Sequence, residues 1–174
     1  MGAVALALAM GAKQVLGSAR NEDFLPRVKA LAAPGRVDIL KSGSEPVKEW
    51  SKKATAGHGI DIVIDAMGPG SPKEPFLEAL QSLNRGGFFV DIGAMQEQVP
   101  IDMFWVMSND ITLIGSSWFT TPVAQKMVDM VETGQLDLGF YEHRIFSLEA
   151  VNDAVSDTES REGGFTNYVV KPDQ

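Results

Sequence analysis

The stretch GIDIVIDAMGPG, residues 59–70, constrains the fold more than any other part of the sequence. Its isoleucine and valine residues are interrupted only by Asp61, and the run ends in small residues at Asp65 to Gly68. This composition predicts a strand buried on both faces of a parallel sheet. Ligands of open α/β sheets bind beyond the carboxyl ends of the strands, which makes Asp65 to Gly68 a candidate ligand-facing loop. An ordinary core strand and turn is the simpler interpretation of this stretch taken alone.

Helix and strand patterns alternate along the rest of the chain. Helices are predicted over residues 3–10, from 21 to about 32, from 44 to 55 with Ser44 as the N-cap, over 76–83, from 121 to 134, and after a cap at Ser147. Strands are predicted over 14–19, 37–40, 88–92, 111–114, 141–146 and 168–170, and the stretch before residue 110 that contains Phe104 and Trp105 shows no clear pattern. Such an order predicts parallel strands joined by right-handed crossovers, in a doubly wound α/β sheet.

The composition of the chain argues against several kinds of partner and against a metal site. A chain of 174 residues with 44% hydrophobic residues can bury one core, and its net charge of −8 argues against nucleic acid and anionic membranes as partners. Cysteine is absent and the only histidines are His58 and His143, so we expect no zinc in this chain. The apolar run at residues 3–10 is too short to span a bilayer, and we expect a soluble cytoplasmic protein.

Several segments resemble one family. MGAVALALAMGAKQVLGSARNEDF, residues 1–24, is similar to the first helix and second strand of the coenzyme domain of the medium-chain dehydrogenase/reductases, the superfamily of zinc alcohol dehydrogenases and quinone oxidoreductases. GIDIVIDAMG resembles the fourth strand of that domain, LNRGGFFVDIGA the fifth and DITLIGSS the sixth. The segment YEHRIFSLEAVNDAVSDTESREGGFTNYVVKP is similar to the family's C-terminal strand, helix and strand.

The resemblance implies a domain organisation. Residues 1–139 would form a Rossmann-like domain truncated at its N-terminus, without the first strand and the glycine loop that binds a dinucleotide's phosphates. Residues 140–174 would form a return segment packed on that domain. The family's catalytic half, with its zinc ligands, has no counterpart in the sequence.

The end of the second strand selects the coenzyme in dinucleotide folds, because a carboxylate there binds the ribose hydroxyls and repels a 2′-phosphate. Here Ser18, Ala19, Arg20 and Asn21 occupy this position, and no carboxylate precedes Glu22. Serine and asparagine can hydrogen-bond a phosphate, and an arginine can pair with it through two N–H groups. The sequence therefore favours NADP over NAD, with a plain surface arginine as the alternative.

The same resemblance implies further coenzyme contacts at later strand ends. Asp65, Ala66, Met67 and Gly68 would lie near the adenine ribose, and Gly93, Ala94, Ser116 and Ser117 near the nicotinamide. No residue is predicted to be catalytic. Without the glycine loop, we expect the chain to bind a dinucleotide weakly or not at all.

The leading hypothesis is a fragment of an NAD(P)H-dependent oxidoreductase that transfers hydride between nicotinamide and an alcohol or carbonyl compound, inactive by itself. A non-catalytic dimeric binding or assembly module is one alternative. An S-adenosylmethionine-dependent methyltransferase is another, suggested by Asp65 and the pair Gly86-Gly87. We expect a homodimer formed through the edge strand Ile111 to Gly115, whose unpaired backbone groups invite pairing with a second copy.

Overall fold

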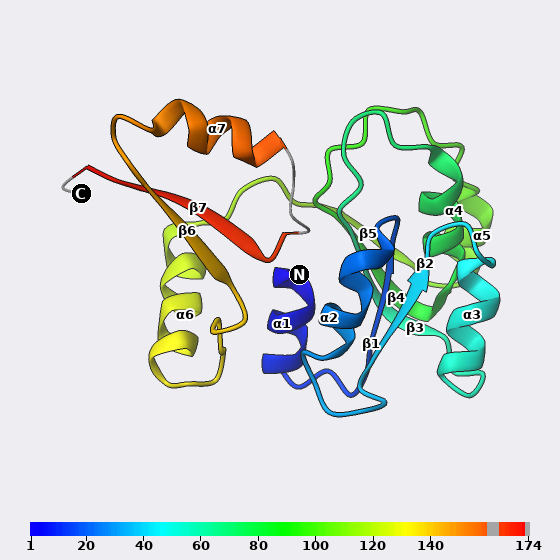
Figure 1. Cartoon of the computed structure of the whole chain (residues 1–174). Helices are drawn as coiled ribbons and strands as arrows, with labels where there is room; N and C mark the ends of the chain where they lie inside the picture. The colour runs from blue at the N-terminus through cyan, green and yellow to red at the C-terminus, as the bar shows by residue number, and fades with distance from the viewer. Residues whose placement is uncertain (160–163, 173–174) are drawn as a thin grey trace. The chain divides into compact units, whose positions relative to one another are not determined.

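A computed structural model describes residues 1–159 and 164–172 of the chain (Figure 1). Helices and strands alternate in the order α1 (Gly2–Ala9), β1 (Val15–Ala19), the 3₁₀ helix η1 (Glu22–Phe24), α2 (Leu25–Lys29), β2 (Val37–Lys41), α3 (Val47–Ala54), β3 (Ile60–Asp65), α4 (Lys73–Gln81), β4 (Leu83–Asp91), α5 (Met103–Ser108), β5 (Thr112–Gly115), α6 (Thr121–Glu132), β6 (Glu142–Ser147), α7 (Val151–Glu159) and β7 (Thr166–Lys171).

The strands form sheets with the orders β1-β2, β3-β4-β5 and β6-β7. Both β3 and β5 run parallel to β4, and β6 runs parallel to β7. The Val15 N–H donates to the Arg36 carbonyl at the start of β1 and β2, and the Ser42 N–H donates to the Ala19 carbonyl at their ends. These two strands therefore also run parallel. The predicted α/β class with parallel strands is therefore confirmed.

The chain folds as two compact units. The first contains Met1–Val15, Asn21–Val37 and Thr121–Gln174, and the second contains Leu16–Arg20 and Asp38–Thr120. Residues 160–163 and 173–174 of the predicted return segment lie outside the described residues. The predicted boundary after residue 139 stays a prediction.

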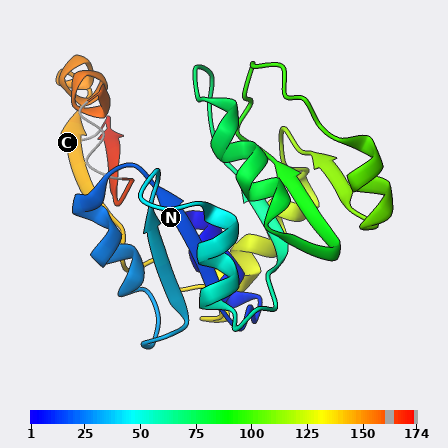
Figure 2. The same cartoon turned by 90° about the vertical axis from the view of Figure 1, so that its right-hand side faces the viewer.

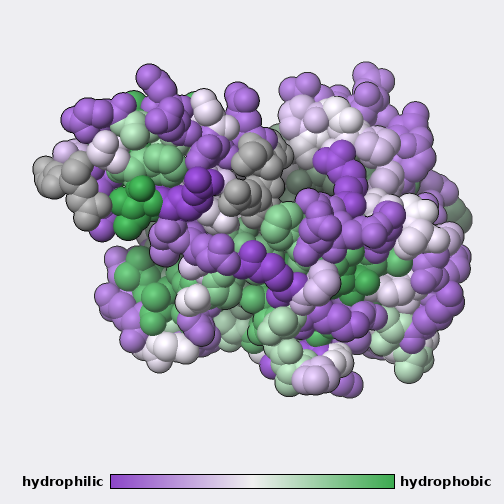
Figure 3. Space-filling view, viewed as in Figure 1, coloured by the Kyte–Doolittle hydropathy of each residue, from purple (hydrophilic) through white to green (hydrophobic). Residues whose placement is uncertain are grey.

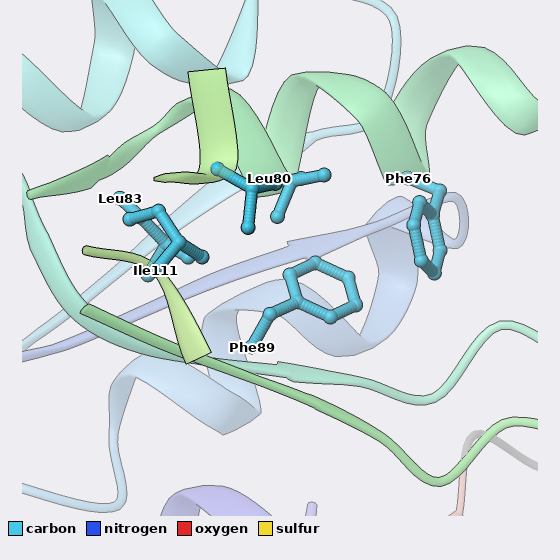
Figure 4. Close-up of a cluster of buried hydrophobic side chains, with 6 residues drawn as sticks. Phe76, Leu80, Leu83, Phe89 and Ile111 are labelled. Carbon is cyan, nitrogen blue, oxygen red and sulfur yellow. The ribbon is translucent and has the colours of Figure 1, made fainter. Parts of the chain in front are cut away.

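In the second unit, α4 and α5 cover one face of the β3-β4-β5 sheet. Figure 2 shows α4 lying along this sheet, and Figure 4 shows that side chains from α4, β4 and the residue before β5 point toward one another. Phe89 of β4 is almost fully buried, and its ring centroid lies 4.5 Å from that of Phe76 on α4. The buried members of this cluster are Phe76, Leu80, Leu83, Phe89, Val106 and Ile111.

The prediction that β3 is buried on both faces is wrong. The side chain of Ile62 is 59% exposed and that of Ile64 is 46% exposed, whereas Asp65 at the strand end is buried. Side chains alternate between the two faces of a strand, and the helical layer of this unit covers only the face that carries Phe89. On the opposite face, the side chains of Ile62, Ile64 and Phe88 are exposed.

The helix before β4 ends earlier than predicted. α4 ends at Gln81 rather than at the glycines, and the strand already begins at Leu83. Ile60 pairs with Leu83 and Ile62 with Phe88, so β4 carries an irregularity between these pairs. Gly86 lies inside it with a φ of 77°, and its N–H donates to the Asn109 carbonyl. The glycines therefore form a bulge within the strand instead of stopping a helix.

Two predicted helix caps are also wrong. The Ser44 hydroxyl donates to the Lys41 carbonyl at 2.8 Å, and α3 begins only at Val47, whose N–H donates to the Glu78 carboxylate of α4 at 3.1 Å. Ser147 is the last residue of β6 and α7 begins at Val151. At the start of α3, the Glu78 carboxylate accepts the hydrogen bond that the Ser44 side chain was predicted to accept.

Helix α5 was not predicted. Its N-cap is Asp102, whose carboxylate accepts hydrogen bonds from the N–H groups of Phe104 and Trp105. Conversely, the helix predicted from residue 21 to about 32 is shorter, because Asn21 caps a 3₁₀ turn and α2 ends at Lys29.

The first unit has its own small core of Ala5, Met130 and Leu136. Arg27 joins α2 to β6, since its guanidinium donates to the Glu142 carboxylate at 2.6 Å and lies 4.0 Å from the ring centroid of Phe165. Apolar residues of α6 also reach the surface, as the green area in the lower left of Figure 3 shows. Among the described helices, none has the length and apolar character needed to cross a membrane.

Candidate functional site

The carboxyl ends of β3, β4 and β5 lie at one edge of their sheet. Asp65 is in register with Asp91, and Asp91 is in register with Gly115. Beyond these pairs, the Ile92 N–H donates to the Asp65 carbonyl and the Ser116 N–H donates to the Asp91 carbonyl, both at 2.9 Å. The sheet register therefore brings together the three loops that begin at Ala66, Ile92 and Ser116.

Two of these loops are in direct contact. A Cβ atom on Gly93 would overlap the backbone of Met67, and one on Gly68 would lie 3.7 Å from the Gly93 carbonyl oxygen. Glycine at position 93 thus lets the backbone of the β4 loop pack against that of the β3 loop. The contact between the two loops at this point is made by backbone atoms.

The two aspartates at this edge differ in environment. Asp65 is buried, and burial raises the pKa of its carboxyl, with the neighbouring charge of Asp91 adding to the rise and a hydrogen bond from the Met67 N–H opposing it. Asp91 is half-buried, and its Oδ1 accepts a hydrogen bond from the Gly93 N–H at 3.0 Å. The Asp91 side chain therefore fixes the start of the loop that contacts Met67.

The remaining predicted residues of these loops face solvent. Ala94 has a φ of 58°, a left-handed conformation that costs an L-residue energy, and its side chain is exposed. Ser116 and Ser117 are exposed after β5. Their hydroxyl groups can donate and accept hydrogen bonds at the same sheet edge.

The predicted loop after β1 belongs to the other sheet of this unit. Ser18, Ala19 and Arg20 are exposed, and β1 pairs with β2 and not with β3. The side-chain oxygen of Asn21 accepts a hydrogen bond from the Asp23 N–H at 3.0 Å and caps η1. The β3, β4 and β5 loops thus converge through sheet register, whereas the residues after β1 stand on a separate pair of strands.

Two residues at this sheet edge were not among the predicted coenzyme contacts. Gly115 lies beside Asp91 in the sheet, and a Cβ atom built on it would have no neighbour within 4 Å. Asp91 orders the Gly93 loop through the hydrogen bond described above. The sequence signal that could have identified Asp91 is an aspartate at a strand end two residues before a glycine, the spacing of a local side-chain-to-backbone turn.

Metal ligands do not converge in the part of the chain that the structure describes. No group of three or more His, Asp or Glu side chains there could hold a metal ion. His58 Nε2 lies 3.2 Å from Asp61 Oδ1 in an exposed pair. The described residues therefore do not fit a zinc site.

Known proteins match most of this sequence. The family model described as zinc-binding dehydrogenase matches residues 1–133. A quinone oxidoreductase-like protein 2 homolog from Nematostella vectensis is 24% identical over 154 residues, which are 83% of this chain and 40% of that protein. An alcohol dehydrogenase from Moraxella sp. (strain TAE123) is 29% identical over 134 residues, which are 77% of this chain and 37% of that protein.

Solved structures of alcohol dehydrogenases have a similar fold. The alcohol dehydrogenase TADH from Thermus sp. ATN1 matches 97% of this chain and 47% of its own with a TM-score of 0.82 and 19% identity. An alcohol dehydrogenase from Thermotoga maritima matches 97% of this chain and 46% of its own with a TM-score of 0.77 and 25% identity. The chain spans about two fifths of the length of the curated relatives named above. The match over residues 1–133 shows that this chain belongs to the zinc-binding dehydrogenase family, to which it corresponds over the Rossmann-like, coenzyme-binding part.

Proposed function

We propose that this chain is the coenzyme-binding part of an NADP(H)-dependent oxidoreductase acting on alcohols, aldehydes, ketones or quinones. The observation that carries the proposal is the convergence of the loops after β3, β4 and β5, where the Gly93 backbone packs against Met67. A nicotinamide coenzyme, when bound, supplies the hydride chemistry, and the protein binds and orients it. Membership of the zinc-binding dehydrogenase family argues against the alternative of a methyltransferase.

The residues at the sheet edge suit such a ligand. A Cβ atom on Gly115 would meet nothing within 4 Å, so a flat ligand can approach the backbone closely at this position. The hydroxyl groups of Ser116 and Ser117 are exposed beside them. Burial raises the pKa of the Asp65 carboxyl, and the neighbouring charge of Asp91 adds to the rise.

The preference for NADP over NAD rests on Arg20. Its side chain is exposed at the end of β1, and the residues before it, Ser18 and Ala19, carry no negative charge. An arginine can bind a 2′-phosphate through two charge-assisted hydrogen bonds. Asn21 keeps its side-chain N–H groups for a ligand while its oxygen caps η1.

Calorimetric titration of the chain with NADPH and NADH tests this preference. We expect weak binding of both, with NADPH bound about tenfold more tightly, and Arg20→Gln to abolish the difference. Arg85→Gln is the matched control, because Arg85 is an exposed arginine at the amino-terminal part of β4 that pairs with Asp110. Tighter binding of NADH, or an unchanged preference in Arg20→Gln, would contradict the assignment.

We further propose that the chain does not catalyse hydride transfer by itself. No candidate proton donor accompanies the convergent loops among the described residues other than Asp65 and Asp91. Incubation with NADPH and a panel of aldehydes, ketones and quinones should leave the absorbance of the reduced nicotinamide unchanged. Oxidation of NADPH that depends on both chain and substrate would show the opposite. Binding without turnover would fit the alternative of a non-catalytic module.

The proposed homodimer uses the outer edge of β5. This strand ends the β3-β4-β5 order, and its four residues are all exposed. The Ser116 N–H points toward β4, so by alternation the Leu113 N–H points outward. Sedimentation at tens of micromolar should show a dimer, Leu113→Pro should give a monomer, and Leu113→Thr should keep the dimer. A monomeric parent chain would remove the proposal.

The cytoplasmic location and the exclusion of nucleic acid and membranes as partners stay predictions from the sequence.

A further inference from the structure

A pocket of about 320 Å³ opens to solvent in the first unit. It lies between α1, the end of α2 and residues 135–140, which follow α6. Ala5 and Ala9 lie one turn apart on α1 and both line the pocket, so their short side chains leave room that larger ones would fill. An apolar cavity of about 150 Å³ holds a benzene molecule. The pocket of the first unit therefore has room for an aromatic ring with a short chain.

Most of the wall of this pocket is apolar. Leu8 of α1, Leu31 after α2, and Leu136 and Phe140 after α6 supply its larger side chains. Leu136 is buried and packs with Ala5 in the small core of the unit, which fixes this side of the wall. Pockets that bind small molecules are lined in this way, with a few polar groups that orient the ligand.

Two polar residues line the same pocket, and each is held in place by a hydrogen bond. The Gln135 Nε2 atom donates to the Ala9 carbonyl at 3.0 Å, and the Gly139 N–H donates to Asp137 Oδ1 at 2.7 Å. Among the described residues, none donates to Gln135 Oε1 or Asp137 Oδ2. Asp137 is also the only charged residue among the described residues that line the pocket. These acceptors and this negative charge are complementary to a cation that donates hydrogen bonds.

We propose that this pocket binds a small primary amine with an apolar body, whose ammonium group pairs with Asp137 and whose body packs against Leu8, Leu31 and Phe140. An alkylammonium group is positively charged at neutral pH, as the lysine side chain is. Its three N–H donors suit the oxygens of Asp137 and Gln135. The inference is independent of the proposed coenzyme, because the described residues that line the pocket belong to the first unit and the loops after β3, β4 and β5 belong to the second.

Titration of the full chain with phenethylamine hydrochloride, followed through the amide NMR signals, tests the site. We expect saturable shifts at Leu8, Leu31 and Asp137, with a Kd on the order of 1 mM for a ligand of this size. Val123 and Val128 are exposed apolar residues of α6 outside the pocket, and their signals should not shift. Shifts that do not saturate, or equal shifts at Val123 and Val128, would indicate nonspecific adsorption and overturn the proposal.

The need for a positive charge is tested with ligands of similar shape. Phenethyl alcohol, which is neutral, should bind about fivefold more weakly than the amine, and the phenylacetate anion should bind more weakly still. In Asp137→Asn the amine and the alcohol should bind equally, while the retained Oδ1 atom still accepts from the Gly139 N–H. Asp153→Asn is the matched control, since this exposed aspartate of α7 does not line the pocket, and it should keep the preference for the amine. Equal binding of amine and alcohol to the parent chain would overturn the assignment of an amine ligand.

A larger side chain in the pocket provides a second test. Ala30 lines the pocket at the end of α2, so Ala30→Leu should weaken binding of phenethylamine about tenfold by occupying part of its volume. Ala33→Leu is the control, because Ala33 is exposed and does not line the pocket, and it should leave the affinity unchanged. Unchanged affinity in Ala30→Leu, or an equal loss in both variants, would overturn the placement of the ligand.

Discussion

Gly93 packs directly on the backbone of Met67, and this contact holds the loop after β4 against the loop after β3. A Cβ atom on Gly93 would overlap Met67, and it would also lie 2.6 Å from the carbonyl carbon of Ala66. These are backbone atoms, which cannot swing aside as the end of a flexible side chain can. The packing of the β4 loop against the β3 loop therefore depends on glycine at position 93.

We expect Gly93→Ala to lower the free energy of unfolding by about 1–3 kcal/mol, because the loops must separate to admit the methyl group. Gly115→Ala is the matched control, since a Cβ atom there meets nothing within 4 Å. Its effect should stay within about 0.5 kcal/mol. Urea denaturation of the three proteins measures both values. Equal stability of Gly93→Ala and the parent chain would show that the loop contact is dispensable.

Asp65 should make stability depend on pH. Its folded pKa lies above its ordinary value of 3.8, so between the two pKa values the folded state binds more protons than the unfolded state. The free energy of unfolding should therefore fall as pH rises from about 3.8 through the raised pKa. Asp65→Asn should remove this part of the fall, and Asp61→Asn on the same strand should keep it because Asp65 is unchanged. Thermal unfolding across this pH range provides the measurement.

The cap of α5 should be measurable by a pair of variants. Asp102→Ala removes the acceptor for the Phe104 and Trp105 N–H groups and should cost about 0.5–2 kcal/mol of stability. Asp102→Asn retains a side-chain oxygen at the same position and should cost much less. Chemical denaturation distinguishes them, and an equal loss in both variants would mean that charge rather than the cap hydrogen bonds matters.

The β3-β4-β5 core should respond strongly to truncation of Phe89. This side chain is 2% exposed and packs on Phe76, so Phe89→Ala should lower the free energy of unfolding by about 3–5 kcal/mol. Phe104→Ala is the control, since Phe104 is 72% exposed, and should change it by about 0.5 kcal/mol or less. Comparable losses in the two variants, measured in urea, would contradict the placement of the core.

Much of the fold was predictable because it depends on local pattern. The alternation of apolar runs and turn residues gave the order of helices and strands, and the resemblance of segments such as LNRGGFFVDIGA to the coenzyme domain is confirmed by the family match. The errors occur where the partner lies elsewhere in the chain. Val47 is capped by Glu78 of another helix, and Gly86 bonds to Asn109 instead of ending a helix.

The candidate site was also predictable only in part from the sequence. The sequence could identify Asp65 to Gly68, Gly93 and Ser116 as strand-end residues, because strand ends follow from composition. Their assignment to a coenzyme stays a prediction. Asp91 and Gly115 escaped the predicted set because their role comes from register, and register is set by hydrogen bonds between strands far apart in the chain.

The sequence by itself indicated the α/β class and the parallel strands through periodicity and turn residues, and the family through the resemblance of several segments to it. Only the tertiary structure decided that Gly93 packs on Met67, that Asp65 is buried with an unpaired oxygen, and that β3 leaves Ile62 and Ile64 exposed. An apolar run predicts a buried strand, but burial is produced by the layers that actually pack on each face. Here Val63 of that strand packs against the Phe89 core, whereas Ile62 and Ile64 on its other face are exposed.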